Sequence, residues 1–150
     1  MAVIWLDNTG QDPELQDGIL RILYGLRVAP PLPSVAKSIY SILKEQGVGQ
    51  ALQRYRELKR QSPTGYDFRE AELNRLGYHL LQSGRVQDAI AVFVQNVESF
   101  PDAFNTYDSL GEAYLAAADT AQAIANYRHS LELNPENTGA TRTLKRLQAE

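Results

Sequence analysis

The sequence has no cysteine, which excludes disulfide bonds and thiolate metal sites. It also has no surplus of basic charge, because 15 lysines and arginines stand against 18 aspartates and glutamates, a formal net charge of −3. This balance gives no reason to expect nucleic acid or an anionic membrane as a partner. The opening apolar run, residues 2–6, is too short for a signal peptide core or a membrane span. We therefore expect a soluble chain.

Motifs for catalysis and cofactor binding are equally scarce. No phosphate-binding glycine pattern occurs, and His79 and His129 lack metal-ligand spacing. Ser34–Lys37 and Ser41–Lys44 match the S-x-x-K motif, in which the lysine helps to activate a nucleophilic serine for acylation. The companion motifs K-T-G and S-D-N are absent, and so short a motif is common by chance near helix starts. We predict no active site, no cofactor and no metal.

What the sequence does contain is an internal repeat of 34 residues. Shifting Glu70–Ala103 onto Phe104–Asn137 gives eight identical pairs, where average residue usage would give about two by chance. In each unit, apolar residues recur with helical spacing in two segments separated by a short break. In the second unit the break is Asp119-Thr120, and both residues are good helix caps. Each unit is therefore predicted to be a pair of helices.

Small and aromatic residues at matching positions of the two units predict close helix contacts. A glycine or alanine lets two helices approach, and an aromatic ring fills the space beside it. The matched pairs are Gly77 and Gly111, Ala89 and Ala123, and Phe93 and Tyr127.

This pattern resembles the tetratricopeptide repeat family, in which a bulky residue, Leu-Gly, an aromatic, alanine, an aromatic and proline follow in order. The second unit matches with Tyr107, Leu110, Gly111, Tyr114, Ala123, Tyr127 and Pro135, and the first with Leu73, Leu76, Gly77, Leu80, Ala89, Phe93 and Pro101. The chain departs from the family by placing leucine at two aromatic positions of the first unit. It also has Asn96 and Ser130 where the family usually has alanine.

A degenerate third unit comes before these two. Ala51, Tyr55 and Pro63 lie 38 residues before their counterparts in the next unit, which predicts helices at about 34–46 and 48–61. We predict an all-α fold, a right-handed tetratricopeptide-type superhelix of seven helices. Its parts are a proline-rich linker at 30–33, a degenerate repeat at 34–67, repeats at 70–103 and 104–137, and a capping helix at 138–149.

Residues 1–29 follow a different pattern. The apolar run 2–6 followed by the turn formers Asp7–Gly10 predicts a strand that ends in a turn. This strand, the apolar helix pattern Leu15–Gly25 and the linker resemble the end of a β-lactamase-like serine hydrolase, some bacterial members of which continue into a tetratricopeptide tail. The resemblance implies that the catalytic domain would lie upstream of Met1. It also implies an extracytoplasmic location if the parent hydrolase is secreted.

A strand without sheet neighbours cannot satisfy its own backbone groups in a core. We therefore predict that residues 2–6 are disordered, refold as a helix, or pair with a second copy in a homodimer. An alternative is that 1–29 is a further helical pair, with Ile4–Leu6 packed on Ile19, Ile22 and Leu23.

The tetratricopeptide resemblance implies a binding groove lined by the first helix of each unit. The residues expected to face it are Lys37, Tyr40, Lys44, Asn74, Tyr78, Asp108, Glu112, Arg142 and Arg146. Tyrosine and arginine are favoured at binding hot spots. Some family members grip a C-terminal carboxylate with lysine, asparagine and arginine; here Asn74 alone matches, and Asp108 and Glu112 would repel a carboxylate.

We predict a non-catalytic module that binds a protein or peptide partner in this groove. Two alternatives remain. In one, the chain is the C-terminal portion of a β-lactamase-like hydrolase or esterase whose catalytic domain is missing. In the other, the array is a structural spacer for self-assembly.

Overall fold

The computed structural model describes residues 31–149. Contacts divide the chain between Pro31 and Leu32, and the unit that begins at Leu32 is the subject here. The predictions for residues 1–29, namely the strand, the hydrolase-like end, the further helical pair and the dimer contact, lie outside the described residues. In the described part of the chain, no helix is long and apolar enough to cross a membrane.

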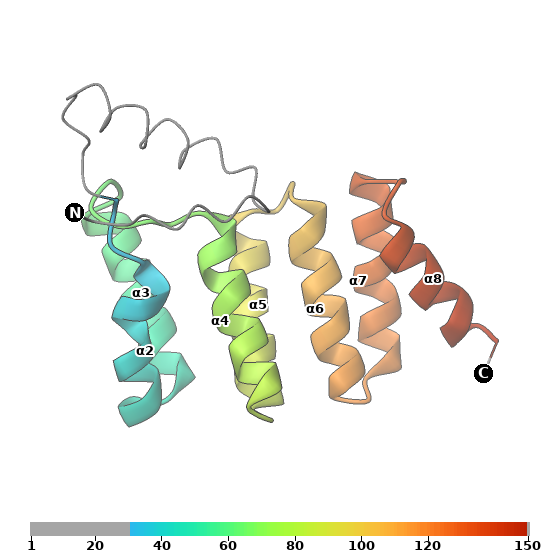
Figure 1. Ribbon diagram of the computed structural model, residues 1–150, viewed down its shortest axis with the longest axis horizontal. Coiled ribbons are helices and arrows are strands. Elements are labelled where there is room, and N and C mark those ends of the chain that lie inside the picture. Colours follow the sequence, from blue (N-terminus) through green and yellow to red (C-terminus); the bar gives the residue numbers. More distant parts are fainter. Residues whose placement is uncertain (1–30, 150) are drawn as a thin grey trace, which may run out of the picture. The chain divides into compact units, whose positions relative to one another are not determined.

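Seven helices and no strand occur between residues 31 and 149, which confirms the predicted all-α array of helical hairpins. Consecutive helices pair as α2/α3, α4/α5 and α6/α7, and α8 packs on α7 (Figure 1). The helices are α2 Val35–Gln46, α3 Val48–Gln61, α4 Glu70–Gln82, α5 Val86–Ser99, α6 Phe104–Ala116, α7 Thr120–Leu133 and α8 Thr138–Leu147.

Three helices begin at short polar residues that accept hydrogen bonds from free backbone N–H groups of the first turn. Ser34 caps α2, Asp119 caps α7 and Asn137 caps α8, each binding an N–H group three residues further on. Asn137 also accepts the N–H group two residues further on. Such caps stabilise a helix by roughly 0.5–2 kcal/mol, which favours a helix start directly after each of these three residues.

The core forms two clusters of buried apolar side chains. The larger one extends from α2 to α6 and contains the fully buried rings of Tyr55 and Phe93. The smaller one lies between α7 and α8, where Ala140 and Leu144 of α8 pack with Tyr127. The apolar side of α8 thus covers the last hairpin, as expected of a capping helix.

Two repeat glycines bring α4 and α6 close to aromatic rings. A Cβ atom added at Gly77 would lie 2.5 Å from the Phe93 ring, and one added at Gly111 would lie 3.1 Å from the Tyr127 ring. Values below about 3 Å require neighbouring atoms to move. The predicted close packing of glycine against an aromatic residue is confirmed, and it is tighter in the first pair.

The two departures from the usual alanine are buried polar residues with hydrogen bonds of their own. The Asn96 amide donates to the Glu70 carbonyl (3.2 Å), and the Ser130 hydroxyl accepts from the Asn137 amide (2.9 Å). Each bond joins the second helix of a hairpin to a neighbouring segment. The hydrogen bond offsets the cost of burying the Ser130 hydroxyl, whereas Asn96 has its Nδ2 bonded and its Oδ1 without a partner among the described residues.

The connection between the first two hairpins pairs with the linker through an isolated parallel bridge between Ser34 and Asp67. The Asp67 N–H group donates to the Pro33 carbonyl (2.9 Å), and the Val35 N–H group donates to the Asp67 carbonyl (3.4 Å). The start of α2 is therefore bonded to the segment that leads into α4.

Candidate functional site

The first helices of the hairpins follow one another through the array, since α2 contacts α4 and α4 contacts α6. Asn137, which caps α8, bonds to Asp108 of α6 and so brings the start of α8 to the same series (2.8 Å). We call the surface of this series the first-helix face. It is defined by Lys37, Tyr40, Lys44, Asn74, Arg75, Tyr78, His79, Asp108, Glu112, Arg142 and Arg146.

A hollow of about 640 Å³ lies between α2 and α4. Two of the predicted groove residues, Lys37 and Tyr40, line it. Arg75 and His79 of α4 line it as well; neither was predicted, because the repeat pattern does not fix how α4 faces the irregular first hairpin. The remaining lining residues are Ser34, Ala36 and Leu76. The hollow thus combines apolar walls with basic and aromatic side chains.

Tyr40 is held in place by residues on both sides. Its hydroxyl lies 3.0 Å from Nε2 of His79, and the two rings meet edge to face with centroids 5.5 Å apart. The Lys44 ammonium group lies 5.1 Å from the centroid of the Tyr40 ring, within cation–π range. A half-buried ring fixed in this way can receive a ligand at little cost in side-chain entropy.

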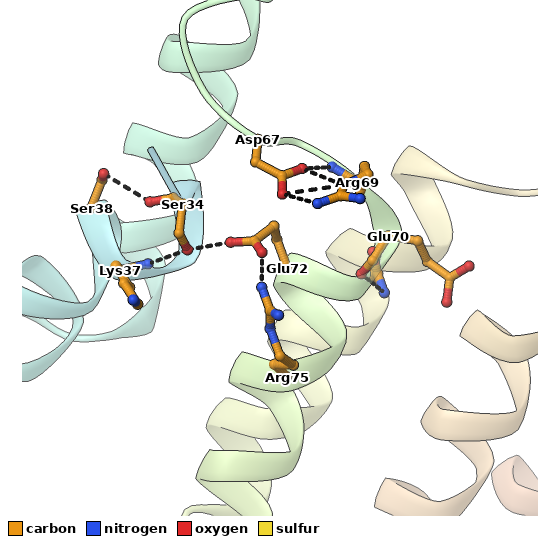
Figure 2. Close-up of polar contacts among 9 residues, drawn as sticks. Ser34, Lys37, Ser38, Asp67, Arg69, Glu70, Glu72 and Arg75 are labelled. Atoms are coloured by element: carbon orange, nitrogen blue, oxygen red, sulfur yellow. Dashed lines mark hydrogen bonds and ion pairs between the residues drawn. The ribbon is translucent and has the colours of Figure 1, made fainter. Parts of the chain in front are cut away.

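A buried carboxylate positions the arginine of the hollow. Glu72 is 1% exposed and accepts hydrogen bonds from the Ser34 hydroxyl and the Arg75 guanidinium (Figure 2). The Arg75 side chain is itself 69% exposed, so one end of its guanidinium is anchored while much of the group faces solvent. The burial of Glu72 was not predicted, because the repeat pattern does not include this position. Glutamates are rarely buried unless they are paired.

Ser34 has a structural role in this network. Its oxygen accepts the backbone N–H group of Lys37 (3.2 Å), and its hydroxyl donates to Glu72. The first S-x-x-K match is therefore explained by a helix cap that also binds the neighbouring helix. Ser41, the serine of the second match, is exposed on α2.

Between α4 and α6, a tyrosine bonds to an acidic residue. The Tyr78 hydroxyl donates to Glu112 (2.8 Å) and lies 3.2 Å from the Ser109 hydroxyl, and its ring packs edge to face on Phe93. Burial raises the pKa of Tyr78 to about 12, and the Glu112 carboxylate contributes to the rise. Tyr78 therefore stays protonated at neutral pH and remains a hydrogen-bond donor to Glu112.

Charged side chains of α6 and α8 affect the pKa of one buried tyrosine, Tyr127 of α7. Burial raises the pKa of Tyr127, Glu112 and Asp108 raise it further, and Arg146 opposes them. Arg142 and Arg146 are exposed, and neither forms an ion pair with any residue of 31–149. Asp108, Glu112 and Arg146 thus all act on the pKa of Tyr127, and Arg146 forms no ion pair with either acid.

Asn74, another of the predicted groove residues, does not line the hollow. Asn74 is half-buried on α4, and its Oδ1 atom has no hydrogen-bond partner among the described residues. Of the histidines, His79 belongs to the hollow, whereas His129 bonds to Glu132 on α7 (2.8 Å). Within residues 31–149, no group of three histidine, aspartate or glutamate side chains could hold a metal ion.

Comparisons with known proteins place this geometry in a known fold. No protein-family model matches the chain. Over 63 residues the chain is 35% identical to human Superkiller complex protein 3. This alignment covers 42% of this chain and 4% of the human protein. The structure of the first TPR of Spaghetti (RPAP3) bound to the HSP90 peptide SRMEEVD aligns with a TM-score of 0.54 and 17% identity, covering 81% of this chain and 97% of that one.

The fold is a tetratricopeptide-type array. The resemblance drawn from the repeat is confirmed at the level of fold, and these comparisons give no support to the hydrolase resemblance of residues 1–29. Seven of the nine predicted residues lie on α2, α4 and α6, and Arg142 and Arg146 lie on the capping helix α8. The structure places Lys37 and Tyr40 in the lining of one hollow, with Lys44 beside the Tyr40 ring.

Proposed function

We propose that this chain is a protein-interaction module whose first-helix face binds a peptide segment of a partner protein. The observation that carries the proposal is the hollow between α2 and α4, whose aromatic and basic side chains are held in place before any ligand arrives. His79 fixes Tyr40, and Glu72 anchors Arg75. Concave sites of this kind, with apolar walls and a few fixed polar groups, are the usual form of ligand pockets.

The structural neighbour supports the class of ligand, because it is a tetratricopeptide domain bound to a peptide. That peptide, SRMEEVD, is rich in acidic residues at its C-terminal end. Here Asp108 and Glu112 occupy α6 on the same face, and like charges would oppose so acidic a peptide. We therefore extend to this chain the binding of a peptide and not the identity of that peptide.

Selection from a random peptide library on the full chain would test the proposal, followed by affinity measurements with charge variants. We expect Lys37→Glu to weaken selected peptides by roughly tenfold, as expected for loss of a contact worth about 1.4 kcal/mol. Lys37 is exposed and forms no ion pair among the described residues, so the fold should tolerate this change.

The matched control is Arg60→Glu, an exposed charge reversal near the end of α3 and outside the first-helix face. It should leave the affinity unchanged. Peptides that bind Lys37→Glu as tightly as the unmodified chain, but lose affinity for Arg60→Glu, would show that another surface is the binding site.

A further inference from the structure

The charges of the first-helix face change sign from one helix to the next. Lys37 and Arg75 line the α2/α4 hollow, and Lys44 lies beside it over the Tyr40 ring. The Arg75 guanidinium is paired with Glu72, but the side chain remains 69% exposed. The charged residues of α6 are two acids, Asp108 and Glu112, and those of α8 are three bases, Arg142, Lys145 and Arg146. Of the α8 bases, Arg142 and Arg146 belong to the first-helix face, which therefore presents a positive, a negative and a positive zone in order along the array.

These zones do not neutralise one another. Asp108 and Glu112 bond to the neutral donors Asn137 and Tyr78, and no lysine or arginine of residues 31–149 forms an ion pair with either. In the same part of the chain, Lys37 and Lys44 form no ion pair with a carboxylate. Charges of both signs thus remain available to a ligand that crosses all three zones.

We propose that the first-helix face recognises an extended peptide segment in which a basic residue is flanked on both sides by acidic residues. The basic side chain lies over Asp108 and Glu112, and the acidic side chains lie over the hollow and over α8. This inference rests on the proposed function and names the chemistry of its partner. Uniformly acidic or uniformly basic segments would meet at least one zone of like charge, which disfavours them.

The spacing of the charges follows from helix packing. Axes of packed helices lie roughly 8–10 Å apart, and an extended peptide advances about 3.3 Å per residue. Ligand charges matched to Arg75 on α4, to α6 and to α8 therefore stand about three residues apart, which gives the pattern Glu-x-x-Lys-x-x-Glu. Lys37 and Lys44 lie one helix further along, on α2. Because the pattern is the same in both chain directions, it does not depend on which way the peptide runs.

A charge-pattern peptide array on the full chain tests this inference. The peptides share a seven-residue core with glutamate, lysine or serine at the first, fourth and seventh positions, a leucine at the second position for the apolar part of the hollow, and glycine and serine elsewhere. We expect Glu-x-x-Lys-x-x-Glu to bind best. The inverted Lys-x-x-Glu-x-x-Lys peptide should bind roughly tenfold more weakly, since three exposed ion pairs each contribute a modest factor. Moderate salt should reduce the difference.

A reversal of charge on α6 should reverse the preference at the central position. Glu112→Lys is expected to favour glutamate at the fourth position by roughly tenfold relative to the unmodified chain. Glu98→Lys is the matched control, since Glu98 is exposed in the last turn of α5, outside the first-helix face. The control variant should rank the peptides by affinity in the same order as the unmodified chain.

The outcomes separate this inference from the proposed function. If neutral or uniformly charged peptides bind best, and Lys37→Glu still weakens them, the face binds peptides but the charge pattern is overturned. If Glu112→Lys and Glu98→Lys have the same effect on the order of peptides, the pattern is likewise overturned. If no peptide in the array or the random library binds, the proposed function itself fails.

Discussion

At Gly77 the chain has no Cβ atom, and the space that one would take is filled by the ring of Phe93. A Cβ atom at this position would lie 2.5 Å from the ring, which leaves no room even for alanine unless the ring shifts. Phe93 is completely buried, and Tyr78 packs on its edge. Because the side chain of Gly77 is a single hydrogen atom, α4 and α5 can pack this closely.

We expect Gly77→Ala to lower the free energy of unfolding by about 1–2 kcal/mol, measured by urea denaturation. Overpacking a tight site costs about 1–3 kcal/mol, and the better helix propensity of alanine offsets part of this cost. Gly111→Ala is the control, because its nearest ring atom lies at 3.1 Å and can be accommodated by a small movement of Tyr127. If the two variants lose equal stability, the tighter contact at Gly77 is not the cause.

Glu112→Gln should lower the pKa of Tyr78. Burial is the main reason that this pKa is raised to about 12, and the hydrogen bond and charge of Glu112 add to the rise. An unfolded tyrosine loses its proton near pH 10. Between these pH values the folded state holds more protons, so its stability falls as pH rises, and the fall should be smaller in Glu112→Gln.

The measurement is a pH titration of tyrosine absorbance together with urea denaturation between about pH 9 and 12. Glu98→Gln is the control, since no tyrosine of residues 31–149 owes a raised pKa to Glu98. An unchanged Tyr78 titration in Glu112→Gln would contradict the expected contribution of the carboxylate.

At the scale of helices, Asn137 links three elements through one side chain. Its Oδ1 atom caps α8, and its Nδ2 atom donates to Asp108 of α6 and to Ser130 of α7. The helix that closes the array therefore depends on one amide for its start and for two of its contacts.

We expect Asn137→Ala to reduce the stability of α8 by about 1–2 kcal/mol, since a cap and two side-chain hydrogen bonds are lost. The amides of α8 should exchange with solvent deuterium faster, while those of α4 keep their protection. Asp119→Ala serves as control, because the Asp119 side chain caps α7 through a single N–H group and bonds to no other helix within residues 31–149. Unchanged exchange in α8 would argue against the linking role.

How far the sequence predicts this molecule differs between elements. Repeated positions of the two 34-residue units make equivalent contacts, so the packing of Gly77 against Phe93 was predictable from the 34-residue shift. The burial of Glu72 was not predictable from the repeat. Its partners Ser34 and Arg75 meet where the irregular first hairpin packs on the second. The residues expected to face the groove came from the family resemblance and stay a prediction, whereas the hollow depends on how two unlike hairpins pack.

At the scale of the whole array, helices contact their hairpin partners and helices of the adjacent hairpin, and α8 contacts α7. Stability in such arrays is close to a sum of local terms. The larger core cluster lies between α2 and α6, and the smaller one between α7 and α8. The described unit should therefore open most easily at α8.

Two leucine-to-alanine variants test whether local stability is lower at α8 than in the larger core cluster. Leu80→Ala, in the larger cluster, should lower the free energy of global unfolding by about 2–4 kcal/mol. Leu144→Ala, in the smaller cluster, should mainly speed hydrogen exchange in α8 and leave α4 and α5 protected. Equal loss of protection across all seven described helices in both variants would show a single cooperative unit instead.

The bridge between Ser34 and Asp67 also determines how the chain would carry mechanical load. Tension applied at Leu32 meets the two backbone bonds that tie the linker to Asp67 before it can unwind α2. Asp67 is in turn bonded to Arg69, at the start of α4. A pull on this end is thus passed directly to the second hairpin, and the first hairpin is a loop outside the path of the force.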